Sequence, residues 1–386
     1  MLALLLLTLP ACDVVPPLVR PGADWVVDCG GRGDFVRIQD AIDVARSGDR
    51  IAVEACTYHE CIDYRAKVLD IYGTDGSGAT VIDGDLAGTV VRVVSGESLD
   101  TRLAGVTIRG GYAPRGGSAI EVRQSSLLLE DVVLENNGHA YAVLHAADAF
   151  VTVIGLTIAD NDVRPEGMGI YSVGGGFNGE DIDVDCDGGL FGMYQHNAAT
   201  LDRTAFNCAA GHALFSSNGE LRAWRSAFTG GITGLYVEEA SAADTSQRTM
   251  ISNVLATGAT GMDIRYMTME IANSVISGTD AGLNVVGLNP YSFLWNSVVL
   301  DSNCGVRGDG GSLTVYYSDF WNNADNTCSV TADTPYTFDP MFVDYPTDLD
   351  PGAGSGLIDA GEPAALDTDG TRSDIGAFGG PLGAWR

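Results

Sequence analysis

Four aspartates alternate with apolar residues in one short segment of this chain. They are Asp181, Asp183, Asp185 and Asp187, separated by Ile182, Val184 and Cys186. Because successive side chains of a β-strand point to opposite faces, a strand here would carry all four carboxylates on one face. Calcium takes six to eight oxygen ligands, so this row is a candidate cation or ligand site. A charged, solvated strand face is the simpler alternative.

Two further groups of charged residues are candidates for the same chemistry. Arg203 and Arg225 follow the aspartates at about one and two repeat lengths, which places them on the next two coils of a stacked fold. Asp367, Asp369 and Asp374 surround a glycine near the C-terminus and form a candidate second cation loop. They lack the full spacing of an EF-hand, so a turn-rich cap stabilised by Arg372 is the alternative.

These residues sit in a chain that repeats one short phrase. Two apolar or small residues one position apart recur at a mean interval of roughly 24 residues, a period typical of solenoids. The copies are Val106/Ile108, Val132/Leu134, Leu156/Ile158, Ile182/Val184, Thr204/Phe206, Ala227-Phe228 with Ser226, Val254-Leu255, Ser274/Ile276, Ser297/Val299 and Ser318/Phe320. Each copy is too short for a βαβ unit but holds three short strands. We therefore predict an all-β fold, a right-handed single-stranded parallel β-helix of roughly 12 coils.

The register of the repeat also makes predictions for amides and cysteines. Asn137, Asn161 and Asn323 share one offset and are expected to bond backbone groups at turns. Cys186 and Cys208 share another offset on adjacent copies, so stacked strands would bring them roughly 4.8 Å apart, within disulfide range. Cys304 and Cys328 are a second candidate pair with unequal offsets. Among Cys29, Cys56 and Cys61, one must be left over.

The first residues read as an export signal. Residues 1–11 carry no charge, and Leu9-Pro10-Ala11-Cys12 resembles the lipobox of bacterial lipoproteins. By that resemblance Cys12 receives the lipid, residues 12–22 form a tether, and the protein is anchored to the bacterial cell envelope, at the outer membrane or cell surface. The membrane is a partner only through that anchor. An ordinary cleaved signal is the alternative.

The rest of the chain is divided into a β-helix and a cap, and the net charge limits its partners. Residues 23–330 are assigned to the β-helix and residues 331–386 to a C-terminal cap, with an amphipathic helix around Ile38, Ala41, Ile42 and Ala45 covering the first open edge. Asp34 is its expected N-cap. A formal net charge of −30 disfavours nucleic acid as a partner and could attract calcium as a cofactor. We expect a monomer.

Both ends of the chain resemble known β-helix proteins. The matching segments are Gly33-Asp34-Phe35, Ile38-Gln39-Asp40-Ala41-Ile42, Gly48-Asp49, Ile51-Ala52-Val53, Thr57-Tyr58-His59-Glu60, Gly73-Thr74-Asp75-Gly76, Asp339-Pro340-Met341-Phe342-Val343, Gly354 to Gly361 and Asp367 to Phe378. By these segments residues 25–83 resemble the opening coils of the pectate-lyase-like superfamily, and the tail resembles the end of many secreted bacterial β-helix proteins. One fold hosts many functions, so the resemblance speaks to fold first.

The resemblance also frames the choice between functions. The superfamily contains pectin methylesterases, polysaccharide lyases and glycoside hydrolases, and its lyases often use an arginine or lysine base beside calcium held by aspartates. The later catalytic motifs of the esterases and the motifs of family 28 hydrolases are missing, and we assign no catalytic residue. Our leading prediction is a non-enzymatic surface lipoprotein that binds carbohydrate or serves a structural or adhesive role. The alternative is a divergent lyase or glycosidase acting on acidic polysaccharide.

Two observations would separate these predictions. A groove with aspartate and arginine clustered on one face would favour the alternative over a uniform surface. Aromatic residues on neighbouring copies could stack on sugar rings or could be packed within the fold; they are Tyr171, Phe177, Phe191, Tyr194 and His196.

Overall fold

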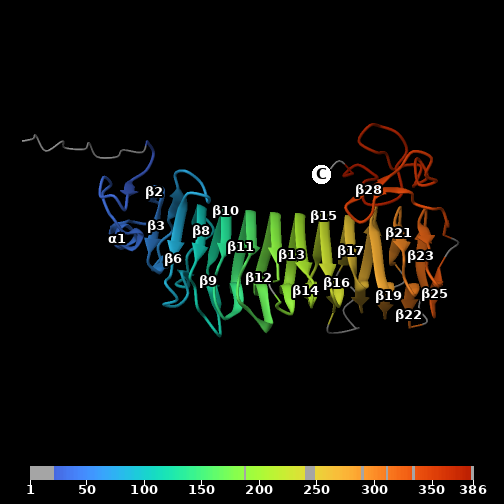
Figure 1. Cartoon of the computed structure of the whole chain (residues 1–386), viewed down its shortest axis with the longest axis horizontal. Coiled ribbons are helices and arrows are strands. Elements are labelled where there is room, and N and C mark those ends of the chain that lie inside the picture. Colours follow the sequence, from blue (N-terminus) through green and yellow to red (C-terminus); the bar gives the residue numbers. More distant parts are fainter. Residues whose placement is uncertain are drawn as a thin grey trace, which may run out of the picture.

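The computed structural model shows an all-β parallel β-solenoid of about 13 turns, drawn as a long rod in Figure 1. It describes residues 21–186, 188–239, 248–287, 291–309, 312–332 and 335–383. The parallel β-helix is thus confirmed, whereas the right-handed winding stays a prediction.

The elements are α1 (Ile38–Val44), β1 (Trp25–Val27), β2 (Arg50–Val53), β3 (Cys56–His59), β4 (Ile62–Asp63), β5 (Asp70–Gly73), β6 (Thr80–Asp83), β7 (Val91–Val93), β8 (Arg102–Arg109), β9 (Gly117–Arg123), β10 (Ser126–Glu135), β11 (Ala140–Ala159), β12 (Val163–Asp185), β13 (Phe191–Cys208), β14 (His212–Ser217), β15 (Leu221–Gly230), β16 (Thr233–Glu238), β17 (Arg248–Arg265), β18 (Thr268–Ala272), β19 (Val275–Val286), β20 (Phe293–Trp295), β21 (Val298–Leu300), β22 (Cys304–Gly308), β23 (Ser312–Tyr316), β24 (Asp319–Trp321), β25 (Asp325–Cys328), β26 (Thr331–Ala332), β27 (Phe342–Asp344) and β28 (Asp348–Pro351).

Each coil carries three strand segments, so the rod has three faces, and each face contributes one inward ladder of core residues. Face A carries Ile62, Val91, Ile120, Leu144, Ile170, Met193, Leu214, Leu235, Met262, Leu283 and Val306. Face B carries Ile51, Ile71, Leu103, Leu129, Val153, Gly179, Leu201, Ala223, Ile251, Ile271, Leu294 and Val315. Face C carries Tyr58, Ile82, Ile108, Leu134, Ile158, Val184, Phe206, Phe228, Ala256, Ile276, Val299 and Phe320.

The repeated phrase of the sequence is the inward side of face C. Its second members form the face C ladder with one exception. Val254 pairs with Ser226 and Ala256 pairs with Phe228, so the inward pair of that coil is Val254/Ala256 and Leu255 points outward. Because the strand period is two, an error of one residue in the predicted register moves a side chain to the opposite face. Leu255 therefore lies on the outer side of face C and not in the core.

The N-terminal helix is present, but its cap differs from the prediction. Ile38, Ala41 and Ile42 of α1 are buried in the core. The helix begins after Arg37, and Asp34 instead accepts a hydrogen bond from the backbone N–H of Val26.

The acceptor at the start of α1 comes from the following coil. Both carboxylate oxygens of Glu60 accept backbone N–H groups, from Ile38 at 2.8 Å and from Gln39 at 3.0 Å. Glu60 lies 22 residues after the start of the helix, whereas the sequence rules for an N-cap consider only the residue that directly precedes the helix. The role of α1 as the cover of the first edge stays a prediction.

The amides and the pair Cys186–Cys208 follow the register. The Asn137 side chain donates to the carbonyls of Ile108 and Glu135 and to the side chain of Asn161, forming an amide ladder at one turn. Asn323 donates to the carbonyl of Val299. The disulfides are Cys29–Cys56, Cys186–Cys208 and Cys304–Cys328, and the free cysteine of the described residues is Cys61.

After the last coils the chain folds back over the rod, as the red segment of Figure 1 shows. The short strands β27 and β28 pair antiparallel. Leu349, Leu357 and Ile375 of this segment pack with Val275 and Val298 on the outer side of face C. We call residues 335–383 the C-terminal segment.

Cys12, together with the predicted signal and most of the tether, lies outside the described residues. In the described part of the chain, no helix has the length and apolar character needed to cross a membrane.

Candidate functional site

A groove of about 880 Å³ runs along the outer side of face C. Its floor is a row of outward residues on successive coils: Val133, Thr157, Asp183, Ala205, Ala227 and Leu255. At roughly 4.8 Å per coil, that row is about 24 Å long. The C-terminal segment contributes Pro346, Thr347, Asp348, Leu349 and Phe378. An open, elongated groove of this size fits an extended ligand.

One wall of the groove is a column of bend residues between faces B and C. In each coil from Gly105 onward, the residue before the inward pair of face C adopts a left-handed conformation. From Gly105 to Tyr317 the column contains Gly105, Asp131, Gly155, Asp181, Arg203, Arg225, Asn253, Asn273, Asn296 and Tyr317, with φ between 43° and 77°. Gly, Asn and Asp tolerate this region, whereas a long side chain such as arginine pays a conformational cost there.

Arg203 and Arg225, with φ of 51° and 47°, depart together with Tyr317 from the Gly, Asn and Asp residues that otherwise fill this column. Residues held in a sparsely populated backbone region cluster at functional sites. Both guanidinium groups line the groove. Neither the stacking of coils nor the formation of the turn requires arginine here. The placement of Arg203 and Arg225 therefore motivates a functional hypothesis.

The arginines are held by carboxylates of two adjacent coils. Arg203 Nε lies 2.6 Å from Asp181 Oδ1 and Arg203 Nη1 lies 3.0 Å from Asp202 Oδ2, and the same guanidinium pairs with Glu180. Arg225 Nε donates to Asp202 Oδ1 at 2.8 Å. The hydrogen bond with Asp181 is the main cause that raises the pKa of the Arg203 guanidinium, and it lowers the pKa of Asp181. Arg203 is thus fixed as a cation and is poorly suited to act as a base.

The structure brings together Asp181, Asp183, Arg203 and Arg225, but it breaks the expected row of four aspartates. Asp181 occupies the bend with φ of 55°, so the strand alternation starts after it. Asp183 lies exposed on the groove floor. Asp185 is exposed at the end of β12 and does not line the groove, and Asp187 lies outside the described residues. Four carboxylates in one strand row are not formed, because the bend interrupts the strand.

In the second candidate cation loop, the carboxylates accept hydrogen bonds from backbone N–H groups of the same segment. The Asp367 carboxylate accepts the backbone N–H groups of Asp374 and Gly380, and Asp374 accepts that of Asp359. Burial raises the pKa of both Asp367 and Asp374.

The third aspartate of that loop and its arginine also serve turns. Asp369 bonds Thr371, and Arg372 donates to the carbonyls of Gly361 and Ala360. This arrangement matches the alternative of a turn-rich cap stabilised by Arg372 better than a cation loop.

The aromatic residues of face A stack on one another. Rings of His145, Tyr171, Tyr194, Phe215 and Tyr236 form a continuous pile with centroids 4.7 to 5.7 Å apart. Because neighbouring rings cover each other's faces, only their edges remain for solvent, and stacking on sugar rings is not favoured. Phe177 is buried, and Phe191 stacks on His212.

Several residues in or beside the groove are not among the candidates that the sequence predicts. Glu180 and Asp202 hold the arginines, and Asp131 lines the groove. Asp202 precedes Arg203 directly, which was a usable signal. No sequence signal indicates that residues 346–349 and 378 line the groove, because their position depends on how the C-terminal segment folds back.

Comparisons with known proteins add similarity of fold. No family model matches the chain, and no curated protein matches it. Among solved structures, the A-module of the Azotobacter vinelandii mannuronan C-5 epimerase AlgE6 is 15% identical and covers 77% of this chain and 93% of its own, with a TM-score of 0.47. Pectate lyase Pel9A is 14% identical over 88% of this chain and 90% of its own, with a TM-score of 0.42. Carrot pectin methylesterase is 10% identical, with coverages of 82% and 90% and a TM-score of 0.28.

These solved proteins are similar to the chain in outline only. At such identities and TM-scores no activity and no site residue is carried over. The parallel β-solenoid is established by the strand pairing of the molecule itself, coil upon coil in parallel register.

Proposed function

We propose that this protein binds an extended polysaccharide in the groove of face C. The observation that carries the proposal is the groove itself, about 880 Å³ in volume, with aspartate and arginine clustered on one wall and floor. Arg203 and Arg225 bring positive charge to a wall that otherwise carries aspartates. Hydroxyl-rich ligands suit such a wall, because carboxylates and guanidinium groups offer both acceptors and donors.

The charge of the groove limits the polysaccharide class. Asp131, Asp181, Asp183 and Asp348 line it against Arg203 and Arg225, and both arginines are already paired with carboxylates. A polyanion would meet uncompensated negative charge. We therefore propose a neutral polysaccharide as the ligand, with an acidic one binding only when a cation such as calcium bridges the carboxylates.

Filling the groove tests the proposal. Ala205 is exposed on the groove floor, so Ala205→Trp should reduce the affinity for the bound polysaccharide at least about tenfold. Ala198 is also exposed but lies on face B, and Ala198→Trp is the matched control. Affinity electrophoresis and calorimetry with neutral glycans and with uronate polymers, with and without calcium, would measure the effect. Equal binding by the two variants would reject the groove as the binding site.

A polysaccharide lyase or glycosidase is the second candidate, and it rests on Asp183. This carboxylate is exposed in the middle of the groove and makes no ion pair within the described part of the chain. The raised pKa of Arg203 counts against an arginine base. If uronate polymers are cleaved by elimination, absorbance at 235 nm should rise with wild type and stay flat with Asp183→Asn. A flat trace for wild type on all uronate polymers would remove the lyase.

We also propose that the protein is exported and lipid-anchored through Cys12. Three disulfides in the described residues suit an oxidising compartment. Palmitate labelling of wild type and of Cys12→Ala tests the anchor, because only a lipidated Cys12 makes the label depend on that residue.

A further inference from the structure

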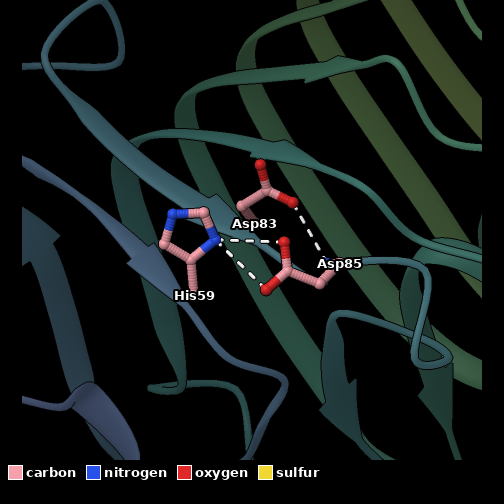
Figure 2. Close-up of side chains that lie close together, drawn as sticks. All are labelled: His59, Asp83 and Asp85. Atoms are coloured by element: carbon pink, nitrogen blue, oxygen red, sulfur yellow. Dashed lines mark hydrogen bonds and ion pairs between the residues drawn. The ribbon is translucent and has the colours of Figure 1, made fainter.

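A second cluster of side chains lies in the first coils, separate from the groove. His59, Asp83 and Asp85 converge there as Figure 2 shows, and one potential ligand atom from each lies within 4.8 Å of the others. His59 Nδ1 is 3.0 Å and 3.1 Å from the two carboxylate oxygens of Asp85. No other group of three such side chains comes this close among the residues that the structure describes.

The solenoid register creates this cluster from residues distant in sequence. His59 ends β3 and pairs directly with Asp83, the last residue of β6 on the next coil. Asp85 follows in a left-handed turn with φ of 47°, which carries its carboxylate back over the imidazole. The histidines look scattered along the sequence, but the coil brings one of them to two carboxylates.

The cluster also has an outer layer that fixes one of its members. Asp83 Oδ2 accepts from Arg109 Nε at 2.8 Å, and Asp83 Oδ1 accepts the backbone N–H of Asp85 at 3.1 Å. Carboxylates that ligate metals are themselves held by such hydrogen bonds. Each carboxylate oxygen has a second lone pair, so these bonds leave Asp83 able to coordinate.

We infer that His59, Asp83 and Asp85 form a surface site for a divalent transition-metal ion such as zinc. One imidazole nitrogen with two carboxylates suits zinc, copper or nickel, whereas calcium prefers oxygen ligands throughout. The two aspartates supply the negative charge that a dication needs, and the half-exposed position of His59 and Asp85 (59% and 62% of the side chain) leaves the site open to solvent. Three protein ligands leave further coordination positions for water or a bound ligand.

Titration of zinc into the full chain without a histidine tag, with calorimetry as the readout, tests the site. His59→Ala and Asp85→Asn should each weaken zinc binding at least about tenfold, whereas calcium should bind weakly to all variants at this site. His139 is exposed as well, stacks on Tyr112 and is not a member of the cluster, so His139→Ala is the matched control. Both test positions are exposed, and circular dichroism verifies that each variant is folded.

A second measurement identifies the donor atoms. The copper(II) complex of the wild type should show coupling to a ring nitrogen by electron paramagnetic resonance, and His59→Ala should lose it. Zinc affinity that survives His59→Ala, or that falls in Cys61→Ser while His59→Ala is unaffected, would overturn the inference. Affinity should also fall as the pH is lowered, because protons compete for the ligand lone pairs.

Discussion

At the scale of single residues, the buried carboxyl group of Asp319 is the most consequential titratable side chain outside the groove. Asp319 is fully buried, accepts the backbone N–H of Phe338 from the C-terminal segment at 2.7 Å, and leaves Oδ2 without a hydrogen-bond partner in the described structure. Burial raises its pKa to about 6. The residue thus links the last coils to the segment that roofs the groove.

This carboxyl group predicts how stability depends on pH. The folded protein binds the Asp319 proton more tightly than the unfolded chain, whose pKa is about 3.9. Stability from this group is therefore full below about pH 4 and is lost as the pH rises through about 6. Asp319→Asn should remove that loss and stabilise the C-terminal segment at pH 7 by up to about 3 kcal/mol.

Denaturation of wild type and Asp319→Asn at pH 5 and pH 7.5 checks the prediction. Asp325 is exposed on β25, and Asp325→Asn should leave the pH dependence unchanged. A constant stability difference between Asp319→Asn and wild type at both pH values would contradict the assignment.

The bend arginines allow a second prediction at this scale, which separates folding from binding. Arg225→Asn places a residue that tolerates φ of 47° where arginine is disfavoured, and it also removes the ion pair with Asp202. These effects oppose each other, so stability should change by less than about 1 kcal/mol. Polysaccharide affinity should still fall, as titration calorimetry would measure. Unchanged affinity would make the bend arginines irrelevant to binding.

At the scale of elements, α1 depends on a contact from the next coil. Glu60 accepts the first two N–H groups of the helix, and its side chain is 2% exposed. Glu60→Ala should cost about 1 to 3 kcal/mol, because two buried donors lose their acceptor. Hydrogen exchange at Ile38 and Gln39 should rise sharply, whereas Asp40→Ala, at an exposed first-turn residue, should leave it nearly unchanged.

The elements also show which parts of the structure a sequence can predict. The inward pairs of face C recur with every coil, and both the fold and the register of Cys186 with Cys208 follow from that recurrence. Val254-Leu255 was placed one residue off, because two adjacent apolar residues leave the strand phase ambiguous. Asp34 was expected to cap α1 from local sequence, but the capping group comes from 22 residues downstream.

The candidate sites were predictable only in part, for the same physical reason. Asp181, Asp183, Arg203 and Arg225 follow the repeat, so their proximity can be read from spacing. The bend that removes Asp181 from the strand row has no signature in that spacing, since Gly, Asp, Asn, Arg and Tyr all occupy it. His59 and Asp83 meet across a pair of coils whose sequences do not repeat the phrase.

At the scale of the whole molecule, the groove is shared between two structural units. Its floor belongs to the coils, and its roof belongs to the C-terminal segment, which is held by a separate apolar cluster. Leu357 is buried in that cluster but does not line the groove. Leu357→Ala should destabilise the segment by about 2 to 5 kcal/mol.

The consequence of loosening the segment should be confined to its surroundings. Hydrogen exchange should accelerate in residues 335–383, while the coils from β8 to β13 keep their protection, because a solenoid coil contacts mainly its neighbours. Polysaccharide affinity should fall although no ligand contact has been removed. Full affinity in Leu357→Ala would show that the floor of the groove binds without its roof.

Each disulfide joins residues one turn apart, with sequence separations of 27, 22 and 24 residues near the beginning, the middle and the end of the rod. A solenoid pulled from its two ends would unwind coil by coil. The residues between two disulfide-linked cysteines would then not be extended, because the disulfide bond bears the force in their place. Each disulfide would thus shorten the stretched chain by about one turn of the solenoid. Reduction should lengthen the fully stretched molecule by roughly 3.5 Å for every residue released, which single-molecule pulling would record as three discrete gains. In such an experiment the three disulfides would act as stops against mechanical unravelling.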